Sequence, residues 1–369
     1  MPYLSNRHIL YLMKLYLLLP VLAALLFSGC KQTEKAVSSK SASPSPVPFS
    51  QIMIKEHEIP DSPEYEKYLE VSSNGPVIPG LYQGTIPQGL AYGKADDLIF
   101  ISGYPFYRTS STISVLSGKD GRFIKVLKLQ NPAGAPHSGH VGGLAVSSKN
   151  LWIASGKGVY RTELGDIREA PNNGILKMKE FVRTAVKGSF ASFSGNTLWI
   201  GEFTSKDGSY AAAETHKVKT VSGVNHGWMA GYDLDPETDR IDSKVTADGL
   251  TYPNRIISIP DEVQGAAFFE NTVILSTSYG RRNKSRLTSY TVPDFTESFE
   301  LSGESRIPMA VLTVKDKIRS LVVPPMSEGI AVYNDSIAVL YESGSDKYRS
   351  TALFPQGRIQ LLDPAVFMK

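Results

Sequence analysis

A short apolar motif that recurs five times constrains the fold of this chain more than any other feature of its sequence. The copies are PQGLAY (residues 87–92), VGGLAV (141–146), SFASF (189–193), QGAAFF (264–269) and EGIAV (328–332). A second apolar segment follows each copy at a nearly constant distance, ending at Ser102 after Gly89 and at Ser155 after Gly143. Such a repeat of paired strands predicts an all-β fold, a β-propeller in which each copy begins one blade.

The second segments support this interpretation because asparagine or aspartate opens every one of them. They read DLIFISG, NLWIASG, NTLWIGEF, NTVILSTSYG and NDSIAVLYESG. Both residue types accept a left-handed backbone and suit a tight hairpin between the first and second strands. The apolar content is nearly continuous, which is typical of strands that are buried on both faces, as in a blade packed between two others.

The spacing of the motifs predicts the number of blades. The intervals before Gly265 and Gly329 are longer than the others and carry extra material. Residues 205–227 are expected to form a long loop over one face, and residues 309–325 either a hairpin or a degenerate sixth blade. Third and fourth strands are expected within 112–129 and 227–245. We expect five blades, with six as the alternative, closed by a leading strand near residues 77–83 that pairs with the last blade.

The first residues have the features of an export signal. Arg7 and Lys14 precede the apolar run 15–27, and Cys30, the only cysteine, follows Phe27-Ser28-Gly29, which resembles a bacterial lipobox. We therefore expect a lipoprotein signal peptide over residues 1–29, with a plain signal peptide and an incidental cysteine as the alternative. Acyl chains such as palmitate on Cys30 would anchor the exported protein in the cell membrane on its extracytoplasmic side.

Residues 30–75 are expected to be a lipid-anchored tether and linker ahead of a propeller domain at 76–369. Residues 31–50 are rich in serine, lysine and proline, a composition that cannot bury enough apolar surface to fold. The stretch PDSPEYEKYLEV predicts a short helix capped at Ser62.

Composition and missing motifs exclude several classes of function. Lysine and arginine total 39 against 36 acidic residues, a net charge of +3 that gives no reason to expect a nucleic-acid partner. None of the six histidines has metal-finger spacing. No GxSxG elbow, phosphate-binding glycine loop or Cys/His pair is present, so a side-chain nucleophile is not expected. We expect a monomer.

Polar residues at the strand starts should surround the central channel. In a propeller, the start of the first strand and the loop after the second strand lie on the same rim. This places Gln88, His140, Gln264 and Glu328 at the channel, with Tyr104, Glu202, Tyr279 and Glu342 around them. The amides and the imidazole have a structural alternative, hydrogen bonding to backbone, whereas a carboxylate such as Glu328 is costly there unless it is paired, wet or bound to a cation.

The loops after three of the second strands share basic and aromatic residues. These candidate rim residues are Arg108, Tyr279, Arg281, Arg282, Arg286, Lys347 and Arg349. Arginine forks suit carboxylate or phosphate ligands. Solvated charge explains any one such loop, but three equivalent loops predict a shared surface for an anionic small molecule or a protein partner.

The motifs QGLA, GGLA and EGIA resemble those of the gluconolactonase-like, strictosidine-synthase-like and NHL-type propellers. Residues 278–285 and 324–348 are similar to a set of secreted bacterial propellers of unassigned activity, and the resemblance covers most of residues 86–348. It implies a calcium ion at the channel mouth held by acidic and amide side chains. Glu328 is the only acidic residue among the strand starts of this chain, a departure from that pattern, and it is the tentative metal ligand.

Two functions follow from these features. The first, which we favour, is a surface-anchored protein that binds an anionic ligand or partner on the channel face. The alternative is a calcium-assisted hydrolase of the lactonase or phosphoester type, in which a cation at Glu328 polarises the substrate.

Overall fold

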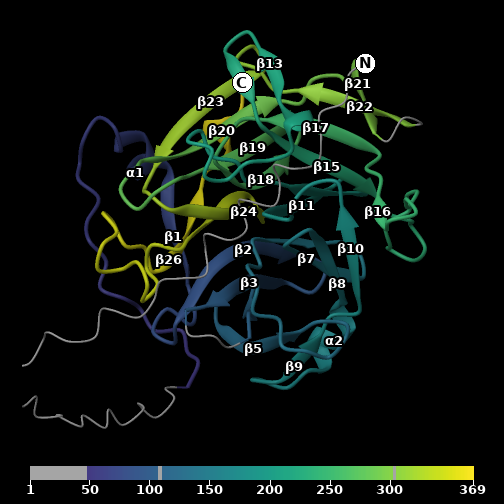
Figure 1. Cartoon of the computed structure of the whole chain (residues 1–369). Helices are drawn as coiled ribbons and strands as arrows, with labels where there is room; N and C mark the ends of the chain where they lie inside the picture. The colour runs from purple at the N-terminus through teal and green to yellow at the C-terminus, as the bar shows by residue number, and fades with distance from the viewer. Residues whose placement is uncertain (1–47, 107–109, 302–304) are drawn as a thin grey trace, which may run out of the picture. The chain divides into compact units, whose positions relative to one another are not determined.

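The computed structural model describes residues 48–106, 110–301 and 305–369. Pro46–Lys369 form one compact unit, which contains five β-sheets arranged as the blades of a propeller. Figure 1 shows their inner strands around a common centre and their outer strands at the periphery. The prediction of a five-bladed β-propeller is confirmed. Cys30 and the expected signal peptide, like Arg108, lie outside the described residues.

Each blade is one sheet that extends from the central channel to the periphery. From the centre outward, blade one contains β2 (Thr85–Gly93), β3 (Leu98–Pro105), β4 (Thr112–Ser117), β5 (Phe123–Gln130) and β9 (Ile175–Lys177). In the same order, blade two contains β6 (Gly143–Val146), β7 (Asn150–Ser155), β8 (Gly158–Glu163), β10 (Glu180–Thr184) and β16 (Leu250–Thr251). Blade three contains β11 (Phe190–Ser194), β12 (Thr197–Gly201), β15 (Gly227–Asp233), β17 (Arg255–Ile259), β22 (Ser305–Val311) and β21 (Glu297–Leu301).

The last two blades have four strands each. Blade four contains β18 (Val263–Phe269), β19 (Thr272–Thr277), β20 (Ser285–Thr291) and β23 (Lys317–Val323). Blade five contains β24 (Ser327–Tyr333), β25 (Ser336–Tyr341), β26 (Arg358–Leu362) and β1 (Ser72–Val77). The chain also forms α1 (Glu66–Val71), α2 (Leu164–Glu169), η1 (Glu214–His216), η2 (Pro364–Phe367) and a hairpin of β13 (Val218–Thr220) and β14 (Gly223–Asn225). None of the helices in the described ranges is long and apolar enough to cross a membrane.

The ring is closed by β1, which pairs antiparallel with β26 in the last blade. A leading strand therefore closes the ring as predicted, but its predicted position near residues 77–83 is wrong, because the strand spans Ser72–Val77 and residues 79–84 form turns. The compact unit starts ahead of residue 76. Helix α1 is also confirmed, but the expected cap is wrong. The helix begins after Tyr65 without a side-chain cap, and Ser62 contributes only its carbonyl, which accepts from the N–H groups of Tyr65 and Glu66.

The extra material before blade five does not form a sixth blade. Strand β22 joins blade three in parallel to β17, and β23 becomes the outermost strand of blade four. The expected fourth strand within residues 227–245 is also wrong, because that region ends in a turn and an isolated bridge between Leu234 and Ile241. Pairing between segments this far apart leaves no local pattern in the sequence.

The repeated glycines allow the inner strands to pack closely around the channel. A Cβ atom on Gly143 would lie 2.2 Å from the amide nitrogen of Ala191, and one on Gly329 would lie 2.7 Å from that of Leu90. Any larger side chain at either position would collide with backbone of the next blade. The glycine in four of the five motif copies is thus a consequence of how closely neighbouring blades approach one another, whereas blade three has Phe190 at this position.

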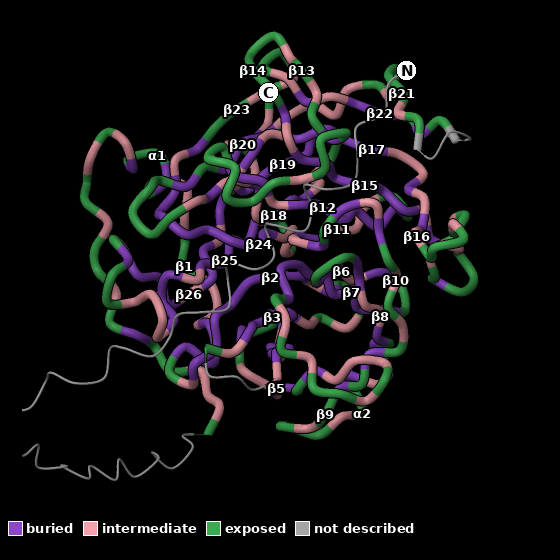
Figure 2. Tube along the Cα trace, viewed as in Figure 1, coloured by how far each residue is buried: buried purple, intermediate pink, exposed green. Residues whose placement is uncertain are grey.

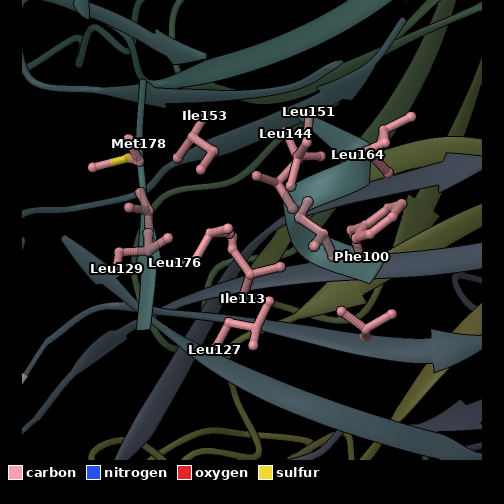
Figure 3. Close-up of a cluster of buried hydrophobic side chains, with 14 of the residues drawn as sticks. Phe100, Ile113, Leu127, Leu129, Leu144, Leu151, Ile153, Leu164, Leu176 and Met178 are labelled. Carbon is pink, nitrogen blue, oxygen red and sulfur yellow. The ribbon is translucent and has the colours of Figure 1, made fainter. Parts of the chain in front are cut away.

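Apolar clusters between neighbouring blades form the core. Figure 3 shows one of them, in which Phe100 and Ile113 of blade one lie near Leu144 and Leu151 of blade two. Figure 2 shows buried residues concentrated along the inner strands and exposed residues in the outer loops. Burial of a large apolar side chain contributes roughly 1.5–3 kcal/mol, so these clusters dominate the stability of the ring.

Candidate functional site

A cavity of about 500 Å³ opens where the inner strands begin. Four side chains in it form what we call the carboxyl–amide cluster: Gln88, Gln264, Glu328 and Glu342. A second group, which we call the cationic–aromatic wall, consists of Tyr104, Arg281, Lys347 and Tyr348. Tyr104, Arg281 and Tyr348 line the cavity, and Lys347 contacts both tyrosines.

Three members of the carboxyl–amide cluster lie at irregularities of the inner strands. The register of β2 shifts between Pro87 and Leu90, so Gln88 lies within the shift. Gln264 and Glu328 occupy the corresponding shifts of β18 and β24. A β-bulge re-aims a side chain that would otherwise alternate across the sheet, which explains how strand residues come to line the cavity.

The two carboxyl groups of the cluster are hydrogen-bonded to each other. Nε2 of Gln88 donates to Oε2 of Glu342 at 3.0 Å, and Nε2 of Gln264 lies 3.4 Å from Oε1 of Glu328. Two carboxyl groups in this contact must hold a proton between them.

Burial and the neighbouring charge keep that proton in place. Burial, followed by the charge of Glu342, raises the pKa of Glu328 well above its ordinary value. Burial also raises the pKa of Glu342 to about 7, although Lys347 and the hydrogen bond from Gln88 oppose the rise. The pair therefore still holds a proton at neutral pH.

The cationic–aromatic wall brings two positive side chains onto one tyrosine ring. Nζ of Lys347 donates to the hydroxyl of Tyr104 at 3.1 Å and lies 4.8 Å from the ring centroid of Tyr348. Cζ of Arg281 lies 4.9 Å from the same centroid. Within the described residues, no carboxylate oxygen lies within 4.0 Å of the charged nitrogens of Lys347 or Arg281.

His140 lies beside this wall, with its ring stacked on Tyr104 at a centroid distance of 4.0 Å. Its imidazole is accessible to solvent but sits inside the concave mouth. Burial, followed by the charge of Lys347, lowers the pKa of His140, which therefore stays neutral near pH 7.

The structure separates Glu202 from the other predicted channel residues. Its Oε1 lies 2.5 Å from Nδ1 of His216 and accepts from the N–H of Trp228 at 3.1 Å, and the side chain is buried away from the cavity. The ring of His216 stacks on Trp228 with centroids 3.7 Å apart. Glu202 therefore holds the long loop of residues 205–227 against blade three.

Fewer residues of the predicted rim line the cavity than the seven that the sequence suggested. Tyr279 and Arg281 line the cavity. The three basic loops meet on one face, since Arg281 contacts Tyr348 in the last loop and Lys347 of that loop donates to Tyr104 in the first. Arg282 and Arg286 are exposed and do not line the cavity. Arg349 is bound to Asp346 and covers the ring of Tyr82.

Sequence reasoning missed three aromatic residues of the cavity. Phe203 and Tyr210 come from the end of blade three and its long loop, and Tyr348 follows the last second strand. Phe203, Tyr210 and Tyr279 contact one another and form a second aromatic group at the mouth. The sequence YESGSDKY held a signal for Tyr348, but no local pattern shows that the long loop folds back over the channel.

Comparison with known proteins yields fold neighbours alone. No family model matches the sequence, and neither does any curated protein. Glutaminyl cyclase of Myxococcus xanthus is 10% identical over 79% of this chain and 97% of that chain, with a TM-score of 0.39. A glucose dehydrogenase-type oxidoreductase of Thermus thermophilus is 9% identical over 79% and 99%, with a TM-score of 0.36. The GH43_1 enzyme of Xanthomonas citri in complex with xylose is 9% identical over 81% and 91%, with a TM-score of 0.41.

These likenesses are weak, and the activity of none of these proteins carries over to this chain. The function is inferred from the side chains of the cavity. By its sheet topology the chain is a five-bladed β-propeller.

Proposed function

We propose that this protein binds a small anionic ligand at the mouth of its channel. The observation that carries the proposal is the cationic–aromatic wall, where Arg281 and Lys347 reach one tyrosine ring without an ion-paired carboxylate among the described residues. A cavity of about 500 Å³ falls in the range typical of small-molecule sites.

The chemistry of the wall suits a carboxylate or phosphate group. Arginine presents several N–H donors in a fixed fork, and lysine adds a point charge. A hydrogen bond to a charged group contributes about 1.5–3 kcal/mol, more than a neutral one. The hydroxyls of Tyr104 and Tyr348, which lie 3.3 Å apart, would orient the bound group.

The proposal also includes a lipid anchor that holds the protein at a membrane. Export by residues 1–29 and acylation of Cys30 would hold the propeller at the extracytoplasmic side of the cell membrane. A ligand site carried on a membrane tether fits a protein that captures a solute or a partner outside the cytoplasm.

Calcium-assisted hydrolysis of a lactone or phosphoester is the alternative. The contact between the carboxyl groups of Glu328 and Glu342 favours it, because a cation can replace a shared proton. The set of oxygen donors in the cavity argues against calcium-assisted hydrolysis. Calcium takes about six to eight oxygen ligands, and no group of three or more acidic, histidine or cysteine side chains that could hold a metal occurs in the described residues.

A thermal-shift screen of the purified full-length protein tests the proposal. The panel contains monocarboxylates, dicarboxylates, sugar acids, amino acids and phosphate monoesters, with neutral analogues as the comparison. We expect at least one anion to raise the melting temperature of the wild type, and Arg281→Ala to abolish the rise. Arg282→Ala is the matched control, because Arg282 is exposed outside the cavity. Absence of any shift, or equal effects of the two variants, would overturn the proposal.

A further inference from the structure

The cavity is divided by charge into two parts. The cationic–aromatic wall presents Arg281 to the cavity and holds Lys347 against Tyr104 and Tyr348. Lys187 lines the cavity as a further cation, and the carboxyl–amide cluster presents Glu328 and Glu342. A ligand that is only anionic satisfies the first part and meets two carboxyl groups in the second. The geometry points to a zwitterionic ligand, an inference that rests on the proposed anion site. Such a ligand is an α-amino acid or a short peptide, whose carboxylate binds the wall and whose ammonium group binds Glu328 and Glu342.

The hydrogen bonds of the carboxyl–amide cluster leave room for such a donor. One oxygen of Glu342 accepts from Gln88 at 3.0 Å, whereas the amide of Gln264 is 3.4 Å from Glu328, which is too long for a strong bond. Glu328 is buried, and its main remaining partner is the carboxyl group of Glu342. An ammonium group has three N–H donors and can bond both carboxylates at once.

Charge balance favours an amine over a hydroxyl. The free pair with one shared proton carries a charge of about −1, and the ionised pair with an ammonium group carries the same net charge. The proton between the carboxyl groups is released to solvent as the ammonium enters, so the buried site never holds two unneutralised carboxylates. A hydroxyl brings no charge and requires the proton to stay.

The two classes of ligand therefore differ in their pH dependence. The titratable or charged groups that line the cavity with the pair, or contact its wall, are Lys187, Arg281, Lys347, His140, Tyr104, Tyr210, Tyr279 and Tyr348. Burial lowers the pKa of His140 and raises that of Tyr104, so these two do not change charge from about pH 7 to 8. Zwitterion affinity should rise with pH as the pair loses its proton, and hydroxy-acid affinity should fall.

Calorimetric titration of the full-length protein with matched compounds tests the inference. The probes are the common L-amino acids, their glycine dipeptides and the 2-hydroxy acids with the same side chains, at about pH 7 and about pH 8. We expect an amino acid or dipeptide to bind at least about tenfold more tightly than its hydroxy acid, with an affinity that rises with pH. Glu328→Gln should remove both the preference and the pH dependence, and the exposed Glu237→Gln should leave them unchanged.

The outcomes separate this inference from the proposed function. Hydroxy acids that bind as tightly as amino acids, or amino acids that bind more weakly at higher pH, would overturn the zwitterion and leave the anion site intact. Binding of no anion of any class would overturn the anion site and the zwitterion together. If Glu328→Gln does not fold, Glu342→Gln replaces it. Proton release on binding is measured by repeating the titration in buffers of different ionisation enthalpy. Binding of amino acids by the wild type without proton release would also contradict the inference.

Discussion

The carboxyl group of Glu328 is hydrogen-bonded to that of Glu342, and Gln88 of the first blade donates to Glu342 from 254 positions away in the chain. The contact between Gln88 and Glu342 joins blade one to blade five at the channel mouth.

The pair should make stability fall as the pH rises. The folded protein keeps a proton on Glu342 up to about pH 7, whereas an unfolded glutamate loses it near its ordinary pKa of 4.5. Since the native state binds more protons in this interval, the free energy of unfolding decreases with pH there. We expect the wild type to lose stability relative to Glu342→Gln between about pH 5 and pH 8. Denaturant unfolding at several pH values measures this, and parallel pH profiles for the two proteins would contradict it.

Gly143 should be intolerant of any side chain. A Cβ atom there would lie 2.2 Å from the backbone of Ala191, so Gly143→Ala should lower the free energy of unfolding by about 1–3 kcal/mol or prevent folding. Gly165→Ala is the control, because the nearest atom to its Cβ would be the end of Arg168 at 4.0 Å and alanine favours helix α2 by about 0.5–1 kcal/mol. Equal stability of the two variants would show that the inner strands can move apart without lowering the free energy of unfolding.

The blade number could be predicted because it rests on local signals, whereas the closing strand was expected near residues 77–83 and lies at Ser72–Val77. The motif around Gly143 and Gly329 records how closely the inner strands pack, and the asparagines mark the hairpins. Strand β22 could not be predicted in the same way. It pairs with β17 of blade three after the chain has already built most of blade four, and no residue near it records that partner.

The candidate site was also predictable only where its residues follow from local signals in the sequence. Gln88 and Glu328 follow from the strand-start rule, and Glu342 follows from the end of a second strand. Glu202 occupies the equivalent of Glu342 in blade three, yet it turns to His216, because the long loop supplies a basic partner that lies outside the repeat. Tyr210 enters the cavity from that same loop.

Calcium should have little effect on the stability of the wild type. The carboxyl pair shares a proton, and with its amide neighbours it supplies few of the oxygens that calcium needs. Adding calcium or a chelator should therefore leave the melting temperature unchanged. A rise with calcium that Glu328→Gln abolishes would instead favour the hydrolase alternative through linkage.

Cys30 should determine where the protein is found. Cys30→Ser removes the only thiol that could carry an acyl chain, so the protein should leave the membrane fraction or remain unprocessed. Fractionation and intact-mass analysis of the two proteins give the result. An unchanged distribution with an unchanged mass would contradict lipid attachment.

The most direct test of the anion site is a calorimetric titration of wild type, Arg281→Ala and Arg282→Ala with the tightest anion found by the thermal-shift screen. Arg281 lies over Tyr348 in the cavity, whereas its neighbour Arg282 is exposed outside it. Losing one charge-assisted contact should weaken binding by about tenfold to a hundredfold in Arg281→Ala. Arg282→Ala should bind as the wild type does, and both variants should unfold within about 0.5 kcal/mol of it. Undiminished binding by Arg281→Ala, or an equal loss in both variants, would contradict an anion site at the channel mouth.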